Sequence, residues 1–379
     1  MNRILSISLF TGCAAVACAK NSPSSEPMGM APQANETPAT TPAVAAPEST
    51  PPSSMPIAAK TTKAPTPSAE MGKVLAELAS LGGKPIESLT AAEARKQPTP
   101  TDAVKALLKK EGKSTAPEEV AKVENRKIPS GAVRIYTPKT GKAPFPVVVY
   151  YHGGGFVIAD LDVYDASPRA LANGSGAVVV SVEYRKAPEN KFPAAHNDAF
   201  AAYQWVLKNT ASFAGDPKRI AVAGESAGGN LAASVSIAAR DKGLQLPVHQ
   251  LLVYPVASSD TDAPSYVTNA DAKPLNKPMM LWFVDKYLRS PADGKDPRIN
   301  LVSANLKGLP PTTIINAEID PLLSDGEKLA EALKAAGVKT TQKTYPGVAH
   351  EFFGMGAVVS GAKDAEAFGA SHLKAAFEK

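Results

Sequence analysis

The apolar positions from residue 147 to the C-terminus fall into short continuous runs separated by longer segments with helical spacing. The run at 147–151, Val-Val-Val-Tyr-Tyr, is typical of a strand that is buried on both faces of a sheet. The predicted strands lie at 147–151, 177–182, 220–223, 251–254, 313–316 and 340–345, and the predicted helices at 194–207, 227–240, 327–336 and 363–377. This alternation predicts an α/β fold with a mainly parallel central sheet flanked by helices.

The remaining segments predict an edge strand and a helical cap. Residues 131–137 alternate in polarity like an edge strand, and 74–81 and 102–110 have the spacing of short amphipathic helices. Between 256 and 299 no strand is evident, although residues 279–283 predict an apolar helix. Because this insertion is long for a loop, we expect it to form a cap together with the N-terminal helices.

The first 69 residues have the composition of an export signal followed by a disordered linker. Residues 1–19 contain the basic Arg3 and an apolar run at 4–17, which is too short to span a bilayer as a helix. Residues 20–69 hold eleven of the 34 prolines and few large apolar side chains. Such a segment cannot bury enough surface to offset the entropy lost on folding.

The end of the export signal leaves three outcomes open, and they differ in the fate of Cys18. Residues 15–18 resemble a bacterial lipobox, in which Cys18 becomes the acylated first residue of a membrane-anchored lipoprotein. The same stretch fits an ordinary A-x-A cleavage site, which would release a periplasmic or secreted protein. The third outcome is an uncleaved anchor. The proline-rich linker directly after Cys18 is typical of a lipoprotein tether.

Charge and cysteine content exclude several classes of protein. The 41 basic and 36 acidic side chains leave a net charge of +5, and the lysines are scattered, so no nucleic-acid partner is expected. Both cysteines, Cys13 and Cys18, lie in the export signal, which excludes a disulfide framework or a cysteine-rich zinc site in the folded part. Because an H-E-x-x-H segment is also missing from the sequence, no metal site is expected.

The segment GESAGG at 224–229 follows a predicted strand and opens a predicted helix. That order of strand, sharp turn and helix is typical of a nucleophile elbow, whose central residue here is Ser226. Its neighbours Gly224 and Gly228 must be small because the turn is strained. The Ser226 hydroxyl would then stand at the C-terminal edge of the sheet, beside the positive end of a helix.

A second glycine-rich segment, HGGGF at 152–156, directly follows the strand at 147–151. Three consecutive glycines let backbone N–H groups turn toward a substrate, as in the oxyanion loops of many esterases. The other expected oxyanion donor is the N–H of Ala227, the residue after the nucleophile. A phosphate-binding loop is the alternative, but the chain contains neither G-x-x-x-x-G-K-[ST] nor G-x-G-x-x-G.

The expected general base is His350, because it follows the predicted strand at 340–345. Of the other four histidines, His152 belongs to the glycine loop, and the remaining three lie on predicted helices or at the start of a predicted strand. The orienting acid of a serine triad should lie between the nucleophile and the histidine, and Asp320 follows the preceding strand. Glu318 and Asp325 remain alternatives for this acid, although Asp325 is also suited to cap the next helix.

Together these motifs resemble those of the bacterial hormone-sensitive-lipase family (family IV) of α/β-hydrolases. The resemblance covers nearly all of residues 70–379. Its motifs are YHGGGF at 151–156, EYRKAPE at 183–189 with FP at 192–193, GESAGGN at 224–230, YP at 254–255, LPP at 309–311, DPL at 320–322 and GVAHEFF at 347–353. It implies one α/β-hydrolase domain at 70–379 with a cap from about 70–125 and about 256–299.

The resemblance also implies a serine esterase that uses no cofactor and cleaves short to medium acyl esters. The triad that it implies is Ser226, Asp320 and His350. The oxyanion donors that it implies are the N–H groups of Gly154, Gly155 and Ala227, with Gly153 as a weaker candidate. Three positions depart from the family pattern: Glu225 replaces a usual Asp, LSD at 323–325 replaces a common charged triplet, and Glu351 replaces a common Gly.

The sequence therefore predicts an exported carboxylesterase that forms an acyl-enzyme on Ser226. An amidase or deacetylase with the same triad is the nearest alternative, and a non-catalytic ligand-binding protein on the same fold is another. The expected partner is a small-molecule ester. A homodimer stays open, and a membrane is a partner only through lipidation of Cys18.

Overall fold

The computed structural model describes residues 64–379 of the protein. The predicted export signal, Cys18 and the linker up to residue 63 lie outside the described residues. Among the helices of the described part, none is long and apolar enough to cross a membrane.

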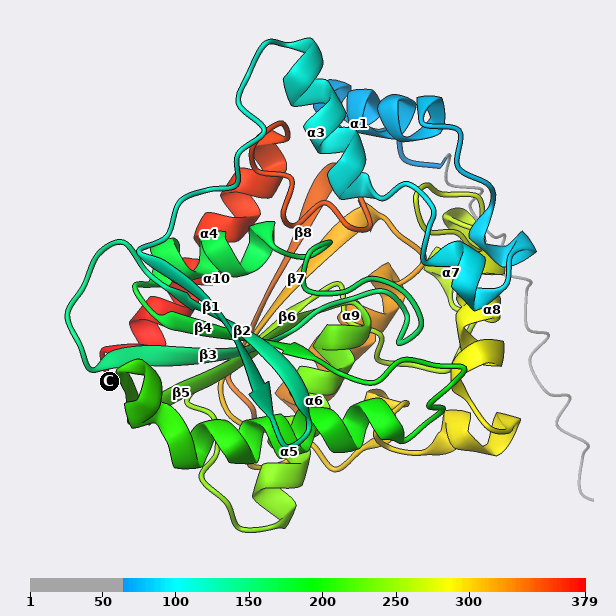
Figure 1. The fold of residues 1–379 in the computed structure, drawn as a ribbon. Helices are drawn as coiled ribbons and strands as arrows, with labels where there is room; N and C mark the ends of the chain where they lie inside the picture. Colours follow the sequence, from blue (N-terminus) through cyan, green and yellow to red (C-terminus); the bar gives the residue numbers. More distant parts are fainter. Residues whose placement is uncertain (1–63) are drawn as a thin grey trace, which may run out of the picture. The chain divides into compact units, whose positions relative to one another are not determined.

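An eight-stranded sheet runs through the described part of the chain (Figure 1). Its strands are β1 (Lys122–Ile128), β2 (Gly131–Thr137), β3 (Phe145–Tyr151), β4 (Val178–Glu183), β5 (Gly215–Glu225), β6 (Gln250–Val253), β7 (Thr312–Ile319) and β8 (Thr340–Ala349). Their order across the sheet is β1-β2-β4-β3-β5-β6-β7-β8. The pairs that involve β1 or β2 are antiparallel and all other pairs are parallel, which confirms the predicted mainly parallel α/β sheet.

The edge of the sheet differs from the prediction. Residues 131–137 were expected at the edge, but β1 pairs with β2 along its whole length and is itself the edge strand. The prediction missed β1 because its sequence, KVENRKI, is largely polar and stays mostly exposed. Charged side chains on an edge strand discourage pairing with another sheet. The start of β1 also lies within the range 70–125 that was assigned to the cap.

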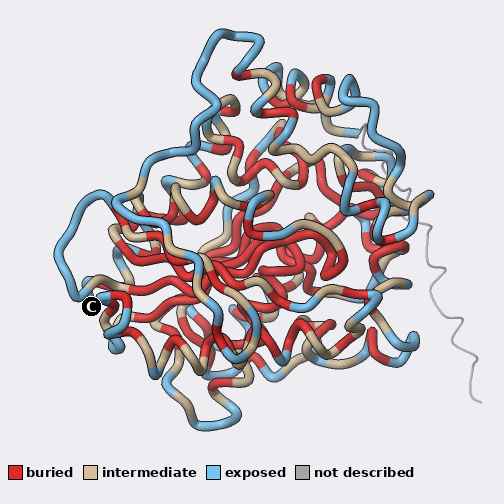
Figure 2. Tube along the Cα trace, in the orientation of Figure 1, coloured by how far each residue is buried: buried red, intermediate tan, exposed pale blue. Residues whose placement is uncertain are grey.

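Both faces of the sheet are buried because successive residues of a strand point to opposite sides. In β3, Val147 and Val149 belong to one apolar core, whereas Val148 and Tyr150 belong to the other. The helices of the first core include α5 (Ala194–Asn209), α6 (Ala227–Asp241) and α9 (Leu323–Ala335), and those of the second include α4 (Ala166–Ser175) and α10 (Ser360–Phe377). Figure 2 shows the strands as the most continuously buried part of the trace.

Helices α5, α6, α9 and α10 correspond to the four helices predicted around the sheet. Helix α4 was not predicted, because its sequence, ASPRALANGS, contains a single large apolar side chain, Leu171. It ends at Gly176, whose positive φ of 67° is the left-handed conformation that glycine adopts readily at a helix C-terminus. Short 3-10 turns complete the connections: η2 (Thr210–Phe213), η3 (Pro291–Lys295) and η4 (Leu301–Ser303).

Two stretches of short helices lie outside the sheet and contact each other. They are α1 (Ala69–Ser80), η1 (Ile86–Ser88), α2 (Ala91–Ala94) and α3 (Pro100–Lys110) in one stretch, and α7 (Pro264–Thr268) and α8 (Lys277–Tyr287) in the other. The indole N–H of Trp282 in α8 donates to the carbonyl oxygen of Leu89 at 3.0 Å. We call these two stretches, residues 69–110 and 264–287, the cap segments.

Capping side chains decide where α1 and α3 begin. The Oγ of Ser68 accepts the N–H of Met71, and Thr99 forms a reciprocal capping box with Asp102 around Pro100. Both helices start before the residues at which their apolar spacing begins, because the capping residues are polar and carry no periodic signal.

Candidate active site

Ser226 stands in the tight turn between β5 and α6. Its φ of 56° and ψ of −119° are a strained backbone conformation for a residue with a side chain. The neighbouring backbone leaves no room for larger residues: a Cβ on Gly224 would lie 2.1 Å from the oxygen of Gly228, and a Cβ on Gly228 would lie 1.9 Å from the oxygen of Tyr151. The turn therefore has the geometry of the nucleophile elbow that the sequence indicates.

Ser226, His350 and Asp320 form a continuous hydrogen-bonded chain. The Nε2 atom of His350 lies 3.0 Å from the Oγ of Ser226, and its Nδ1 lies 2.6 Å from the Oδ2 of Asp320. An ionised carboxylate can only accept, so Nδ1 carries the proton and the neutral ring presents Nε2 as acceptor for the Ser226 hydroxyl. All three residues are buried.

The two alternative acids are engaged elsewhere. The Oε2 of Glu318 accepts the N–H of Gly347 at 2.7 Å. The Oδ2 of Asp325 accepts the N–H groups of Ala257 and Ser258, both at 2.9 Å, so Asp325 bonds to a distant loop rather than capping its own helix. The structure therefore places Asp320, and neither alternative, beside the imidazole.

His350 retains a proton more strongly than a free imidazole does. Burial alone would lower its pKa, but the charge and hydrogen bond of Asp320, followed by the charges of Glu351 and Glu225, raise the pKa above its usual value. The ring of Tyr254 lies 4.4 Å from the imidazole, and its hydroxyl donates to Glu225. This environment stabilises the imidazolium that forms when His350 accepts a proton.

The glycine loop after β3 faces the same site. Gly154 and Gly155 have positive φ angles of 96° and 58°, and together with Ser226 and His350 they line one cavity of about 790 Å³. Gly153 and Ala227 are buried but are not among the residues that line it. A Cβ on Gly153 would lie 2.1 Å from the hydroxyl of Tyr164, so only glycine fits there.

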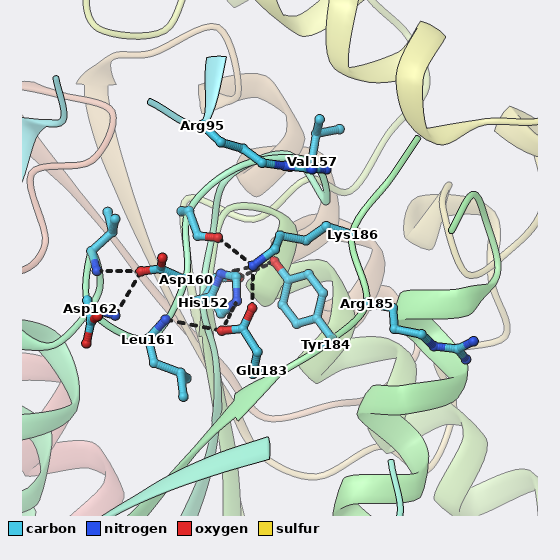
Figure 3. Close-up of polar contacts among 12 residues, drawn as sticks. Arg95, His152, Val157, Asp160, Leu161, Asp162, Glu183, Tyr184, Arg185 and Lys186 are labelled. Atoms are coloured by element: carbon cyan, nitrogen blue, oxygen red, sulfur yellow. Dashed lines mark hydrogen bonds and ion pairs between the residues drawn. The ribbon is translucent and has the colours of Figure 1, made fainter. Parts of the chain in front are cut away.

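Side chains of the EYRKAPE motif contact the start of this loop (Figure 3). The hydroxyl of Tyr184 donates toward the carbonyl oxygens of His152 at 2.8 Å and Gly153 at 3.1 Å. Glu183 pairs with Lys186, and its Oε2 lies 3.8 Å from the Nε2 of His152. Burial lowers the pKa of His152, so this ring is neutral and supports the loop as an uncharged group.

Arg95, at the end of α2, ties a cap segment to the segments around this loop (Figure 3). Its guanidinium donates to the carbonyl oxygens of Val157 at 2.8 Å and Ala187 at 2.6 Å, and it also forms an ion pair with Glu189. Sequence reasoning gave no role to Arg95 or to the side chains of EYRKAPE. For EYRKAPE the available signal was a charged run at the end of a buried strand.

The cavity over Ser226 is enclosed mainly by apolar side chains. Those contributed by the cap segments include Leu75, Leu78, Ile86, Met280 and Phe283. An apolar cavity that contains a few convergent polar groups is the usual form of a small-molecule site. Within residues 64–379, no three His, Cys, Asp or Glu side chains are grouped so that they could hold a metal ion.

Comparison with known protein families matches residues 148–354 to the alpha/beta hydrolase fold. Carboxylesterase NlhH of Mycobacterium tuberculosis is 43% identical over 248 residues, which are 64% of this chain and 78% of that enzyme. Ethyl acetate hydrolase of Pseudomonas putida is 32% identical over 298 residues, covering 76% of this chain and 92% of that enzyme.

The solved structures that resemble this chain are also those of esterases. A Pyrobaculum calidifontis esterase superposes with a TM-score of 0.70 at 38% identity, covering 79% of this chain and 96% of that esterase. A thermophilic carboxylesterase cloned from a metagenomic library superposes with a TM-score of 0.71 at 36% identity, covering 77% and 99%. The chain therefore belongs to the hormone-sensitive-lipase-like family of the α/β-hydrolase fold and is an enzyme that hydrolyses carboxylic esters.

Proposed function

We propose that the protein hydrolyses short to medium acyl esters through an acyl-enzyme on Ser226. The observation that carries this proposal is the hydrogen-bonded chain from Asp320 through His350 to Ser226, which ends in a largely apolar cavity. In this scheme Ser226 is the nucleophile, His350 is the general base and acid, and Asp320 holds the imidazole in the required tautomer.

In the acylation step, the Oγ of Ser226 attacks the ester carbonyl carbon while its proton moves to the Nε2 of His350. The negative charge that develops on the carbonyl oxygen is stabilised by the N–H groups of Gly154, Gly155 and Ala227, with Gly153 as a weaker candidate. The imidazolium then gives its proton to the leaving alkoxide oxygen as the carbon–oxygen bond breaks. The alcohol departs and the acyl group stays on Ser226.

In the deacylation step, water replaces the alcohol. His350 takes one proton from the water while the water oxygen attacks the acyl carbon, and the same N–H groups stabilise the oxyanion. The proton on Nε2 returns to the Oγ of Ser226 as the acyl bond breaks, which releases the acid and restores the enzyme.

The size of the cavity supports short to medium acyl chains. About 790 Å³ is within the range of small-molecule sites, and its largely apolar lining suits an aliphatic acyl group. With p-nitrophenyl esters of graded length, we expect kcat/KM to be highest between acetyl and octanoyl and to fall for palmitoyl. A maximum at palmitoyl would contradict this part of the proposal.

Ser226→Ala tests the nucleophile. We expect p-nitrophenyl butyrate hydrolysis to fall by about 10³-fold or more, with an unchanged circular dichroism spectrum. Ser236→Ala is the matched control, because Ser236 lies on the same helix and its hydroxyl bonds only to the helix carbonyl of Ala232. Turnover like that of the natural protein in Ser226→Ala would refute the proposed mechanism.

A further inference from the structure

Glu351 places a second carboxylate beside the catalytic imidazole. Its Oε1 lies 3.8 Å from the Nε2 of His350, which is the nitrogen that faces Ser226, whereas Asp320 bonds to the opposite nitrogen. The hydroxyl of Tyr164 donates to both carboxylate oxygens of Glu351, at 2.6 and 2.7 Å. A single rigid donor therefore fixes the position of this carboxylate.

Backbone strain and the partial burial of a carboxylate both disfavour this position of Glu351. Its φ of 69° is left-handed, which costs a residue with a side chain free energy that glycine would not lose. Burial raises the pKa of the Glu351 carboxyl, whereas the charge of His350 and the hydrogen bond from Tyr164 favour its ionised form. Backbone strain at a polar, partly buried residue of a site indicates that its position matters for function.

Glu351 and Tyr164 also lie between two cavities. Both residues line the cavity that contains Ser226, and both line a second, more polar cavity of about 1090 Å³ that does not include Ser226 among its lining residues. The second cavity extends past Glu225 and Glu366. This second cavity borders α3 of the cap segments but no residue of α8, so it gives water a second route to Glu351 beside the cavity that holds the acyl chain.

We infer that Glu351, held by Tyr164, positions the water molecule that hydrolyses the acyl-enzyme. This inference rests on the proposed function and concerns only its second step. A distance of 3.8 Å lets one water molecule donate to both the Nε2 of His350 and the Oε1 of Glu351 through two bonds of about 2.8 Å. The oxygen of that water then lies beside Ser226, where the acyl carbon is bound.

The step is balanced without proton transfer to Glu351. One water proton moves to Nε2 of His350 as the oxygen attacks the acyl carbon, and the second O–H keeps donating to the carboxylate. When the bond to the Oγ of Ser226 breaks, the Nε2 proton moves to that oxygen. In acylation the Ser226 hydroxyl is itself the nucleophile, so no water has to be positioned. The charge of Glu351 acts on the imidazolium of both steps alike, so only deacylation depends on Glu351 for the position of its nucleophile.

Glu351→Gln tests the assignment, because it keeps the shape of the side chain and removes the charged acceptor. The enzyme is mixed with saturating p-nitrophenyl acetate, quenched with acid, and the acetylated and free proteins are measured by intact-protein mass spectrometry. Their ratio equals the acylation rate constant divided by the deacylation rate constant, whichever step limits turnover. We expect this ratio to rise about tenfold in Glu351→Gln, as for the loss of one hydrogen bond to a charged group.

Tyr164→Phe separates the effect of the position of the Glu351 carboxylate from the effect of its charge. It keeps the Glu351 carboxylate but removes the hydroxyl that aims it, and we expect the ratio to rise in the same direction. An unchanged or lower ratio in Glu351→Gln, in a protein that unfolds at its usual temperature, would overturn the inference. Ser226→Ala distinguishes this outcome from failure of the proposed function: acetylation of that variant would show that Ser226 is not the nucleophile.

Discussion

The ring of Phe283 in the cap helix α8 packs directly against the backbone of Gly155 in the glycine loop. A Cβ at position 155 would lie 2.2 Å from the Cδ1 of Phe283, so the two residues fit together only because one of them is glycine. Through this contact the cap segments touch the loop that we expect to bind the oxyanion. The contact between Phe283 and Gly155 therefore affects both the shape of the cavity and the position of the expected oxyanion donors.

Gly155→Ala should impair both features. The new methyl group would push Phe283 or the loop aside, and the positive φ of 58° would add strain. We expect kcat for p-nitrophenyl butyrate to fall about 10²-fold, as for loss of an oxyanion donor, and the free energy of unfolding to fall by about 1–2 kcal/mol. Gly176→Ala is the matched control: it has a similar φ of 67° but open space around it, so it should lose stability and keep its activity.

Asp320→Asn should lower kcat by about 10³–10⁴-fold, because an amide no longer fixes the tautomer that leaves Nε2 free to accept a proton. Glu318→Gln serves as the comparison, since Glu318 is close in sequence but bonds to the Gly347 backbone instead of His350. Steady-state kinetics of both variants check the assignment. Equal losses in the two variants would contradict a specific role for Asp320.

The pH profile of kcat/KM should report the raised pKa of His350. The base must be neutral to accept the Ser226 proton, so a raised pKa moves the acidic limb of the profile to a pH above the ordinary imidazole value of 6.5. In Glu351→Gln the limb should move toward lower pH, because a negative charge that stabilises the imidazolium is lost. The measurement is kcat/KM for a neutral ester between pH 5 and 9. A limb that stays in place would show that Glu351 does not act on His350 electrostatically.

Glu351→Gly should make the protein more stable while it deacylates more slowly. The substitution removes left-handed strain and a partly buried carboxylate, and water in the adjoining cavities can accept the hydroxyl of Tyr164 in its place. We therefore expect the free energy of unfolding to rise by about 1 kcal/mol. Urea unfolding followed by circular dichroism measures this change. A less stable variant would indicate that Glu351 serves mainly to hold the fold together.

Lipidation of Cys18 is a separate proposal that rests on the sequence alone. If Cys18 carries the anchor, Cys18→Ser should move the enzyme from the membrane fraction to the soluble fraction of the exported protein. Cys13→Ser is the control, because the apolar run before Cys13 is too short for a signal of this kind. Membrane association that persists in Cys18→Ser would refute the lipoprotein assignment.

Local patterns were sufficient to predict most of the sheet and the elbow. Continuous apolar runs such as 147–151 predict buried parallel strands without any knowledge of the strands that they pair with. The glycines on either side of Ser226, at a junction of strand and helix, predict the tight turn in which the serine lies. Strand β1 and helix α4 were missed for the opposite reason. Their residues are polar or small, and only the neighbours that they pack against hold them in place.

The sequence by itself determined the fold class and the tight turn at Ser226, because both follow from patterns among residues that are close along the chain. Tertiary structure decided which acid faces His350, since Glu318, Asp320 and Asp325 are neighbours in sequence and only folding sends them to different partners. It also decided that Glu351 lies beside the Nε2 of His350 and under the hydroxyl of Tyr164. Tyr164 is 187 residues away from Glu351 along the chain, and no local pattern carries a relationship across that separation.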